Sequence, residues 1–133
     1  MVFTSVELEY LRSQRLGRLA TLTPDGTLQN SPVSHVVDDA TGVISIYGYH
    51  LGTTRKFHNI AANGQVAYVV DDIASLEPWT VRGVEIRGTA EALRDIIPPT
   101  AQLSPEVIRI HPRRIISWSL GTDGTHGSRR TVT

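Results

Sequence analysis

Two neighbouring cations, Arg55 and Lys56, fall in the opening turn of a short helix that the segment Gly52–Asn63 predicts. The first turn of a helix carries unpaired N–H donors and the positive end of the helix dipole, so a cation there costs roughly a few tenths of a kcal/mol. A phosphate among these groups would remove the conflict, because helix N-termini bind phosphates through the same donors. The alternative is a solvated pair whose long side chains bend away from the helix end.

Other reactive side chains form no comparable pattern. The chain has no cysteine, which excludes a disulfide framework, a thiolate metal site and a cysteine nucleophile. No serine lies in a nucleophile elbow and no glycine-rich dinucleotide-binding loop occurs, so hydrolase and Rossmann classes lack support. The histidines show no metal-ligand spacing, and we expect no metal. Haem binding is an alternative, with His35, His50 or His58 as the axial ligand. The five histidines are His35, His50, His58, His111 and His126.

The composition favours one domain with its own core. The chain has 133 residues, 40% of them hydrophobic, and nothing in it resembles a linker between two cores. Its 13 acidic and 13 basic side chains balance, so no overall field would attract nucleic acid or an anionic membrane. Residues 1–10 show neither the basic nor the apolar region of a secretory leader, and no apolar run approaches the ~20 residues needed to span a bilayer. We expect a soluble cytoplasmic protein without a nucleic-acid or membrane partner.

Helical, alternating and turn signals predict two short helices and six or seven strands. A capping box, Thr4-x-x-Glu7, opens the first helix, and turn residues such as Pro24-Asp25-Gly26 separate the strands. The polar segment Gly121–Thr133 is expected to be a mobile tail unless a partner holds it, which leaves residues 1–120 as the domain. Besides the cationic helix, the expected elements are the helix Ser5–Ser13 and the strands Leu16–Thr23, Thr27–Val37, Val43–Tyr47, Gln65–Asp71, Val81–Leu93, Val107–Ile110 and Ile115–Leu120.

This number of strands favours a closed or nearly closed antiparallel β-barrel, because closure removes exposed strand edges. Small barrels fill their interiors with side chains, so a ligand as large as a flavin must lie on the outer wall. A second copy of the chain is the simplest way to cover a flat aromatic ring there.

Six blocks of residues occur in an order that resembles a known family. They are Leu16-Gly17-Arg18-Leu19-Ala20-Thr21, Pro24-Asp25-Gly26, Ser31-Pro32-Val33, Thr54-Arg55-Lys56-Phe57-x-Asn59-Ile60, Val84-Glu85-Ile86-Arg87-Gly88-x-Ala90-Glu91 and Ile110-His111-Pro112-Arg113-Arg114-Ile115-x-Ser117-Trp118. Together they resemble the pyridoxamine 5′-phosphate oxidase-like, FMN-binding split-barrel superfamily over residues 3–120. The greatest similarity is to its actinobacterial branch of flavin- and deazaflavin-dependent oxidoreductases. The resemblance implies a six-stranded split barrel that forms a homodimer, with FMN or coenzyme F420 in each groove between subunits.

The resemblance also implies which residues bind the cofactor. The basic pair of the family, which binds the phosphate, corresponds to Arg55 and Lys56, and Thr54 belongs to the same motif. The segment Ser31-Pro32-Val33 corresponds to backbone beside the tricyclic ring. Here the missing N–H of a proline leaves neighbouring donors available to the ligand. An edge strand protected by proline is the alternative.

Three further groups complete the expected site. Tyr47, Gly48 and Tyr49 correspond to the ribityl or ring region, although both tyrosines could be ordinary aromatic contacts. Arg87 is expected to reach the cofactor of the other subunit, with a solvent-facing ion pair to Glu85 or Glu91 as the alternative. The two tryptophans are candidates to cover the ring across the interface, or to be buried in a core or subunit contact. They are Trp79 and Trp118.

The expected activity is hydride transfer from reduced coenzyme F420 to an unsaturated or quinone-like small molecule. In flavin and deazaflavin enzymes the ring carries the redox chemistry, so no catalytic acid or base is required. The alternatives are an FMN-dependent oxidoreductase and a non-catalytic protein that stores or delivers the cofactor. Oxidation of pyridoxamine phosphate itself is disfavoured, because the C-terminal tail offers only His126, Arg129 and Arg130 for a substrate phosphate. The prolines of Ile96–Thr100 also disfavour the helix that the family often has there.

Overall fold

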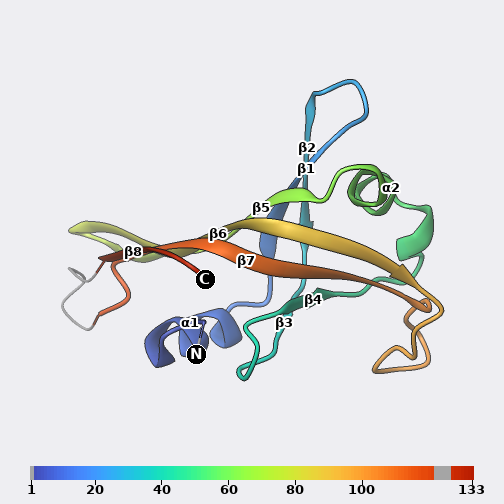
Figure 1. The fold of residues 1–133 in the computed structure, drawn as a ribbon. Coiled ribbons are helices and arrows are strands. Elements are labelled where there is room, and N and C mark those ends of the chain that lie inside the picture. Colours follow the sequence, from blue (N-terminus) through green and yellow to red (C-terminus); the bar gives the residue numbers. More distant parts are fainter. Residues whose placement is uncertain (1, 122–126) are drawn as a thin grey trace.

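The computed structural model describes residues 2–121 and 127–133, and it is mainly β-structure with two α-helices (Figure 1). The helices are α1 (Ser5–Ser13) and α2 (Arg55–Ala62), and a 3₁₀ turn, η1 (Leu51–Thr53), precedes α2. The strands are β1 (Gly17–Leu22), β2 (Leu28–Val33), β3 (Val36–Val37), β4 (Ile44–Ile46), β5 (Gln65–Leu76), β6 (Trp79–Arg94), β7 (Glu106–Trp118) and β8 (Gly127–Thr131).

All strand pairs are antiparallel and form one curled sheet. Its order is β2-β1-β5-β6-β7-β4-β3, and β8 pairs with β7 beside β4. The edge strands β2 and β3 are separated by only Ser34 and His35, so the chain itself brings the two edges of the sheet near one another. No ladder joins these edges within the described residues, and the barrel is split rather than closed. The described sheet has eight strands, so the expected number of six was wrong.

Helix α1 has the bounds that its capping box predicts. The Thr4 backbone N–H donates to Glu7 Oε1 (3.0 Å), and the Glu7 N–H donates to Thr4 Oγ1 (3.2 Å). The apolar side of the helix buries Leu8 and Leu11 against the sheet, where α1 packs on β3 and β6. Local capping therefore determines where the helix begins, and burial of one face determines where it packs.

Two predictions of where strands are interrupted were wrong. The expected strand Thr27–Val37 is divided into β2 and β3 around Ser34 and His35. Conversely, the expected pair around His111-Pro112-Arg113-Arg114 is the single strand β7. Strand pairing shifts from Arg87↔Arg114 to Gly88↔Pro112, so one residue of β7 is left over as a bulge. A bulge tolerates the missing N–H of Pro112, which a regular ladder would not.

The C-terminal segment also differs from the expected mobile tail. Residues 127–131 form β8, which pairs with β7 from Arg114↔Thr131 to Trp118↔Gly127. The Arg130 guanidinium holds this strand against α1 through both carboxylate oxygens of Glu7, at 3.0 Å and 2.5 Å. His126 lies outside the described residues.

Apolar side chains fill the inside of the curled sheet, as expected for a small barrel. No helix forms over residues 96–105, in agreement with the prolines there. No helix among the described residues is long and apolar enough to cross a membrane. The largest fully buried side chains are Tyr68, Phe3, Phe57, Leu11, Leu19, Ile44, Ile46, Leu51, Ile86, Ile108, Ile110 and Ile115.

Candidate functional site

The N-terminus of α2 concentrates positive charge, as the sequence predicts. Thr54 is the N-cap, and its Oγ1 accepts the Phe57 N–H at 3.4 Å. Arg55 and Lys56 occupy the first turn, which contains no acidic residue. Among residues 2–121 and 127–133, no carboxylate forms an ion pair with either cation. The charge of this turn is therefore not neutralised within the described part of the chain.

Burial adds to the conflict at Lys56. The Arg55 side chain is exposed, whereas Lys56 is half-buried. Burial lowers the pKa of the Lys56 ammonium, because the charged form loses solvation without gaining a counter-charge. An anion bound beside the turn would raise the pKa of Lys56 instead, because it would stabilise the charged ammonium.

Asn59 connects this turn to the β1–β2 hairpin. It lies four residues after Arg55, so the two share a face of α2. The buried Asn59 amide donates to Thr21 Oγ1 (3.0 Å) and to Gln29 Oε1 (3.3 Å). The helix face that carries Arg55 is thus directed to the hairpin. Asn59 was not among the site residues predicted from the sequence, although its spacing of four residues from Arg55 contains the signal.

Ser31 follows Gln29 on the same side of β2. Side chains alternate along a strand, so Gln29, Ser31 and Val33 share one face and Pro32 lies on the other. The Oγ of Ser31 is buried and has no hydrogen-bond partner, the single such side-chain atom in the described part of the chain. Buried hydroxyl groups are normally paired, so the Ser31 hydroxyl is available to a bound water or ligand.

Tyr47, Gly48 and Tyr49 lie between β4 and η1, in the segment that leads to α2. Tyr47 is half-buried, and the Tyr49 side chain is 70% exposed. A Cβ on Gly48 would be 3.5 Å from the nearest Leu51 atom, so packing within the chain does not require glycine there. Neither tyrosine has a recorded hydrogen bond to the cations of α2.

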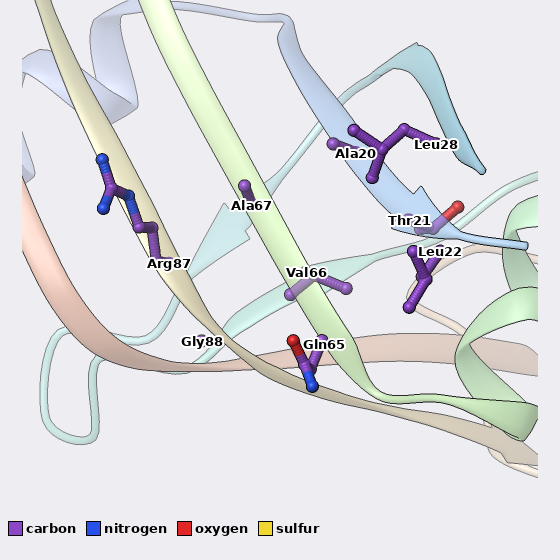
Figure 2. Close-up of a pocket in the computed structure, with 9 residues that line it drawn as sticks. All are labelled: Ala20, Thr21, Leu22, Leu28, Gln65, Val66, Ala67, Arg87 and Gly88. Atoms are coloured by element: carbon purple, nitrogen blue, oxygen red, sulfur yellow. The ribbon is translucent and has the colours of Figure 1, made fainter. Parts of the chain in front are cut away.

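Arg87 lies apart from this group, on the outer face of the sheet. Its guanidinium binds Glu85 at 2.9 Å and 3.3 Å, which is one of the two alternatives that the sequence left open. Strand pairing places Arg87 beside Ala67, and Ala67 beside Ala20. These small side chains form the floor of a groove of about 310 Å³, shown in Figure 2. Within one chain, the structure does not bring Arg87 into contact with Arg55 or Lys56.

A second groove continues along this outer face. It has a volume of about 290 Å³, shares Ala20 and Ala67 with the first, and reaches Trp118 at its far end. Pro32 belongs to the same face, because β1 pairs Arg18 with Pro32. Trp79 lies at the tip of the β5–β6 hairpin and is 64% exposed.

Three polar side chains that the sequence analysis missed hold the segment before α2. Ser104 and Glu106 accept the backbone N–H groups of Leu51 (3.0 Å) and Gly52 (2.9 Å), and Arg94 donates to the Gly52 carbonyl (3.3 Å). These contacts join residues 42 to 54 positions apart in the sequence. No local motif could have identified them.

The structure argues against haem ligation by His35. Its Nε2–H donates to the Leu11 carbonyl (2.7 Å), and its Nδ1 accepts the Tyr68 hydroxyl (2.5 Å). Both ring nitrogens are therefore occupied, and burial lowers the pKa of His35 so that the ring stays neutral. His50 and His58 are exposed. Among the described residues, no cluster of histidine and carboxylate side chains could hold a metal ion.

Comparison with known proteins places this site in context. The chain is 47% identical over 131 residues to a 5a,11a-dehydrotetracycline/5a,11a-dehydrooxytetracycline reductase of Streptomyces rimosus, covering 96% of this chain and 90% of the reductase. An FAD-binding protein of Mycobacterium smegmatis has a similar fold, with a TM-score of 0.64, 21% identity and full coverage of both chains. A conserved hypothetical protein of Mycobacterium tuberculosis gives a TM-score of 0.70 and 21% identity, covering 100% of this chain and 94% of that one.

A family model supports the same relationship. The model described as pyridoxamine 5′-phosphate oxidase matches residues 4–119, which include α2, the β1–β2 hairpin and the outer grooves. With the reductase relative, this match identifies the protein as an enzyme of the oxidoreductase class. The chain belongs to the pyridoxamine 5′-phosphate oxidase family.

Proposed function

We propose that the protein binds coenzyme F420 and transfers a hydride from its reduced form to an unsaturated or quinone-like small molecule. The observation that carries the proposal is the first turn of α2, where Arg55 and Lys56 have no acidic partner among the described residues. That turn offers cations and backbone donors to a phosphate. Identity of 47% to a reductase supports catalytic turnover rather than storage of a cofactor.

The residues present fit a cofactor with a phosphate and a polar ring. Thr54, Arg55 and Lys56 would hold the phosphate, because they form the cap and the cationic turn of α2. Ser31 would donate its unpaired hydroxyl to the ring, next to the backbone of Pro32 and Val33. The ribityl chain would pass Tyr47, Gly48 and Tyr49, in the segment that leads to α2.

The chemistry divides between cofactor and protein. A reduced deazaflavin supplies a hydride, and the protein supplies binding, orientation and exclusion of water. Arg55 and Lys56 fix one end of the cofactor through its phosphate. Ser31 would help to orient the ring through a hydrogen bond from its hydroxyl.

We further propose that the site is completed by a second copy of the chain. The first outer groove is lined mostly by small and apolar side chains, and Leu28, which lines it, is 78% exposed. Covering this face with a partner would bury Leu28 and enclose Arg87 and Trp118 in the interface. Arg87 would then reach the cofactor of the partner, which it does not approach within its own chain.

The substrate class follows from the reductase relative. Its name assigns dehydrotetracyclines as substrates, and a dehydro compound carries the type of unsaturation that accepts a hydride. We propose that this chain reduces an unsaturated polycyclic molecule of the same kind. FMN is the alternative cofactor, favoured by the FAD-binding relative of similar fold.

Separate titrations of the purified protein with F420 and with FMN test the proposal. F420 is expected to bind tightly, and the Arg55→Gln/Lys56→Gln variant should bind it more than about tenfold less tightly, since charge-assisted phosphate contacts are lost. Reduced F420 should then support reduction of 5a,11a-dehydrotetracycline by the wild type. Arg12→Gln, a change in the last turn of α1, is the matched control. Tight binding of FMN alone would refute the cofactor assignment.

A further inference from the structure

The backbone of Gly52 is held at its N–H and at its carbonyl by two charged residues. Its N–H donates to Glu106 Oε1 (2.9 Å), and its carbonyl accepts Arg94 Nη2 (3.3 Å). Arg94 and Glu106 are opposite one another in the β6–β7 ladder, at the end nearest the connecting loop. The last residue pair of the β6–β7 ladder thus holds the segment before α2. We call Arg94 and Glu106 together the clamp.

The clamp also contacts the helix that follows. The Arg94 guanidinium lies 4.7 Å from the centroid of the Phe57 ring, which belongs to the first turn of α2. One peptide earlier, the Leu51 N–H donates to Ser104 Oγ (3.0 Å). The segment that sets the position of the cationic turn is therefore fixed to β6, β7 and their loop through side chains, rather than through a backbone ladder.

Arg94 and Glu106 pack so closely around Gly52 that no larger residue fits at this position without displacing them. A Cβ at Gly52 would lie 2.7 Å from Arg94 Nη1 and 2.8 Å from Glu106 Cδ, so a larger residue would push the two side chains away. Arg94 is exposed and Glu106 is half-buried, so the clamp contributes little apolar burial to the core. Single hydrogen bonds contribute modestly to fold stability, so the main effect of these contacts is on the position of the segment before α2.

We infer that Arg94 and Glu106 are positioning residues that set the first turn of α2 for binding the cofactor phosphate. The inference rests on the proposed function. It makes a prediction opposite to that of simple electrostatics. If Glu106 acted only by repelling a nearby anion, removing its negative charge would strengthen phosphate binding. If Glu106 holds the first turn of α2 in place, removing its side chain would weaken phosphate binding.

Affinities of three variants for two ligands test the inference. The ligands are F420 and the same deazaflavin chromophore without its phosphate-bearing side chain. Glu106→Ala should bind F420 about tenfold less tightly and the chromophore within about twofold of the wild type, because only the phosphate contact depends on the turn. Glu106→Gln keeps an oxygen acceptor for the Gly52 N–H and should restore most of the affinity. Glu91→Ala, with the same change in charge elsewhere on β6, should have no effect.

The outcomes separate this inference from the proposed function. Unchanged or tighter F420 binding by Glu106→Ala overturns the clamp, and so does an equal loss of affinity for both ligands. If the wild type binds neither F420 nor FMN, the proposed function fails first, and the positioning role fails with it. Inorganic phosphate provides a second readout, through its effect on the backbone amide resonances of Lys56 and Phe57. Phosphate should shift these resonances in the wild type and in Glu91→Ala, and much less in Glu106→Ala. If Glu106→Ala does not fold, Arg94→Lys replaces it, with the same expected split between the ligands.

Discussion

At the scale of single residues, Ser31 carries a polar atom without a partner. Its Oγ is buried and makes no hydrogen bond in the described part of the chain. Such an atom destabilises the cofactor-free protein, because it has lost its hydration. The same atom is useful if a ligand provides the missing partner. Ser31 and the cationic turn of α2 share this property, since each is unfavourable in the cofactor-free chain.

Ser31→Ala should therefore separate stability from binding. Without cofactor, its free energy of unfolding should rise by about 1 kcal/mol, since a buried unpaired hydroxyl is removed. Its affinity for F420 should fall by about tenfold, as expected for one lost hydrogen bond to the cofactor. Chemical denaturation and cofactor titration measure the two effects. Ser13→Ala is the control, because the Ser13 Oγ donates to the Tyr10 carbonyl (2.7 Å) and its loss should lower stability without affecting binding. Lower stability of Ser31→Ala would contradict this account.

The two cations of the first turn of α2 could be predicted from the sequence, but the residues that hold this turn in place could not. The position of Arg55 and Lys56 follows from the N-cap Thr54 and from the helix that begins there, both of which are local. Arg94 and Glu106 act on the same turn from the far end of β6 and β7. Their role depends on the pairing of strands distant in sequence, which a single sequence does not specify.

At the scale of elements, the ion pair between the buried Glu7 and the half-buried Arg130 joins α1 to β8. Burial acts to raise the pKa of Glu7, but hydrogen bonds from Arg130 and from the Thr4 N–H outweigh it and hold the pKa below its ordinary value of 4.5. The folded-state pKa is thus depressed. The contribution of the pair to stability is present above about pH 4.5 and is lost as the pH falls through the folded-state value.

Arg130→Met should lower the free energy of unfolding by about 3 kcal/mol at pH 7, because it leaves the Glu7 carboxylate buried without its partner. The difference from the wild type should shrink as the pH falls below 4.5 and the carboxylate becomes protonated. Denaturation at a series of pH values measures both effects. The exposed neighbour Arg129→Met should change stability by less than about 0.5 kcal/mol. An equal loss in both variants would show that the ion pair does not hold β8.

The elements differ in how well the sequence predicted them. The bounds of α1 agree with its capping box, and Arg55 and Lys56 occupy the first turn of α2 as the sequence predicts. The break between β2 and β3 depends on His35 reaching Leu11 and Tyr68, which lie in other elements. The bulge that carries β7 through Pro112 depends on its register with Gly88. A Cβ at Gly88 would come within 2.2 Å of the His111 carbonyl, so glycine is required there by the partner strand.

At the scale of the whole molecule, the outer face of the sheet determines the expected assembly. Wild-type protein should sediment with twice the 14.6 kDa mass of one chain. Ala67→Arg, which places a bulky charge in the floor of both outer grooves, should give a single chain and a large loss of cofactor affinity. Analytical ultracentrifugation measures the mass, and Ala101→Arg in the exposed β6–β7 loop is the control. A monomeric wild type that binds cofactor tightly would refute the proposed assembly.

The contact between Arg130 and the Val2 carbonyl (2.8 Å) brings the beginning and the end of the chain together, and both ends are marked on one side of the molecule in Figure 1. A short linker could therefore join them in a circular permutant. The turn around Gly26 is a suitable place for the new ends, because a side chain added there would meet nothing within 4 Å. In such a permutant β8 would be covalently continuous with α1, and the order of strands in the sheet would be preserved.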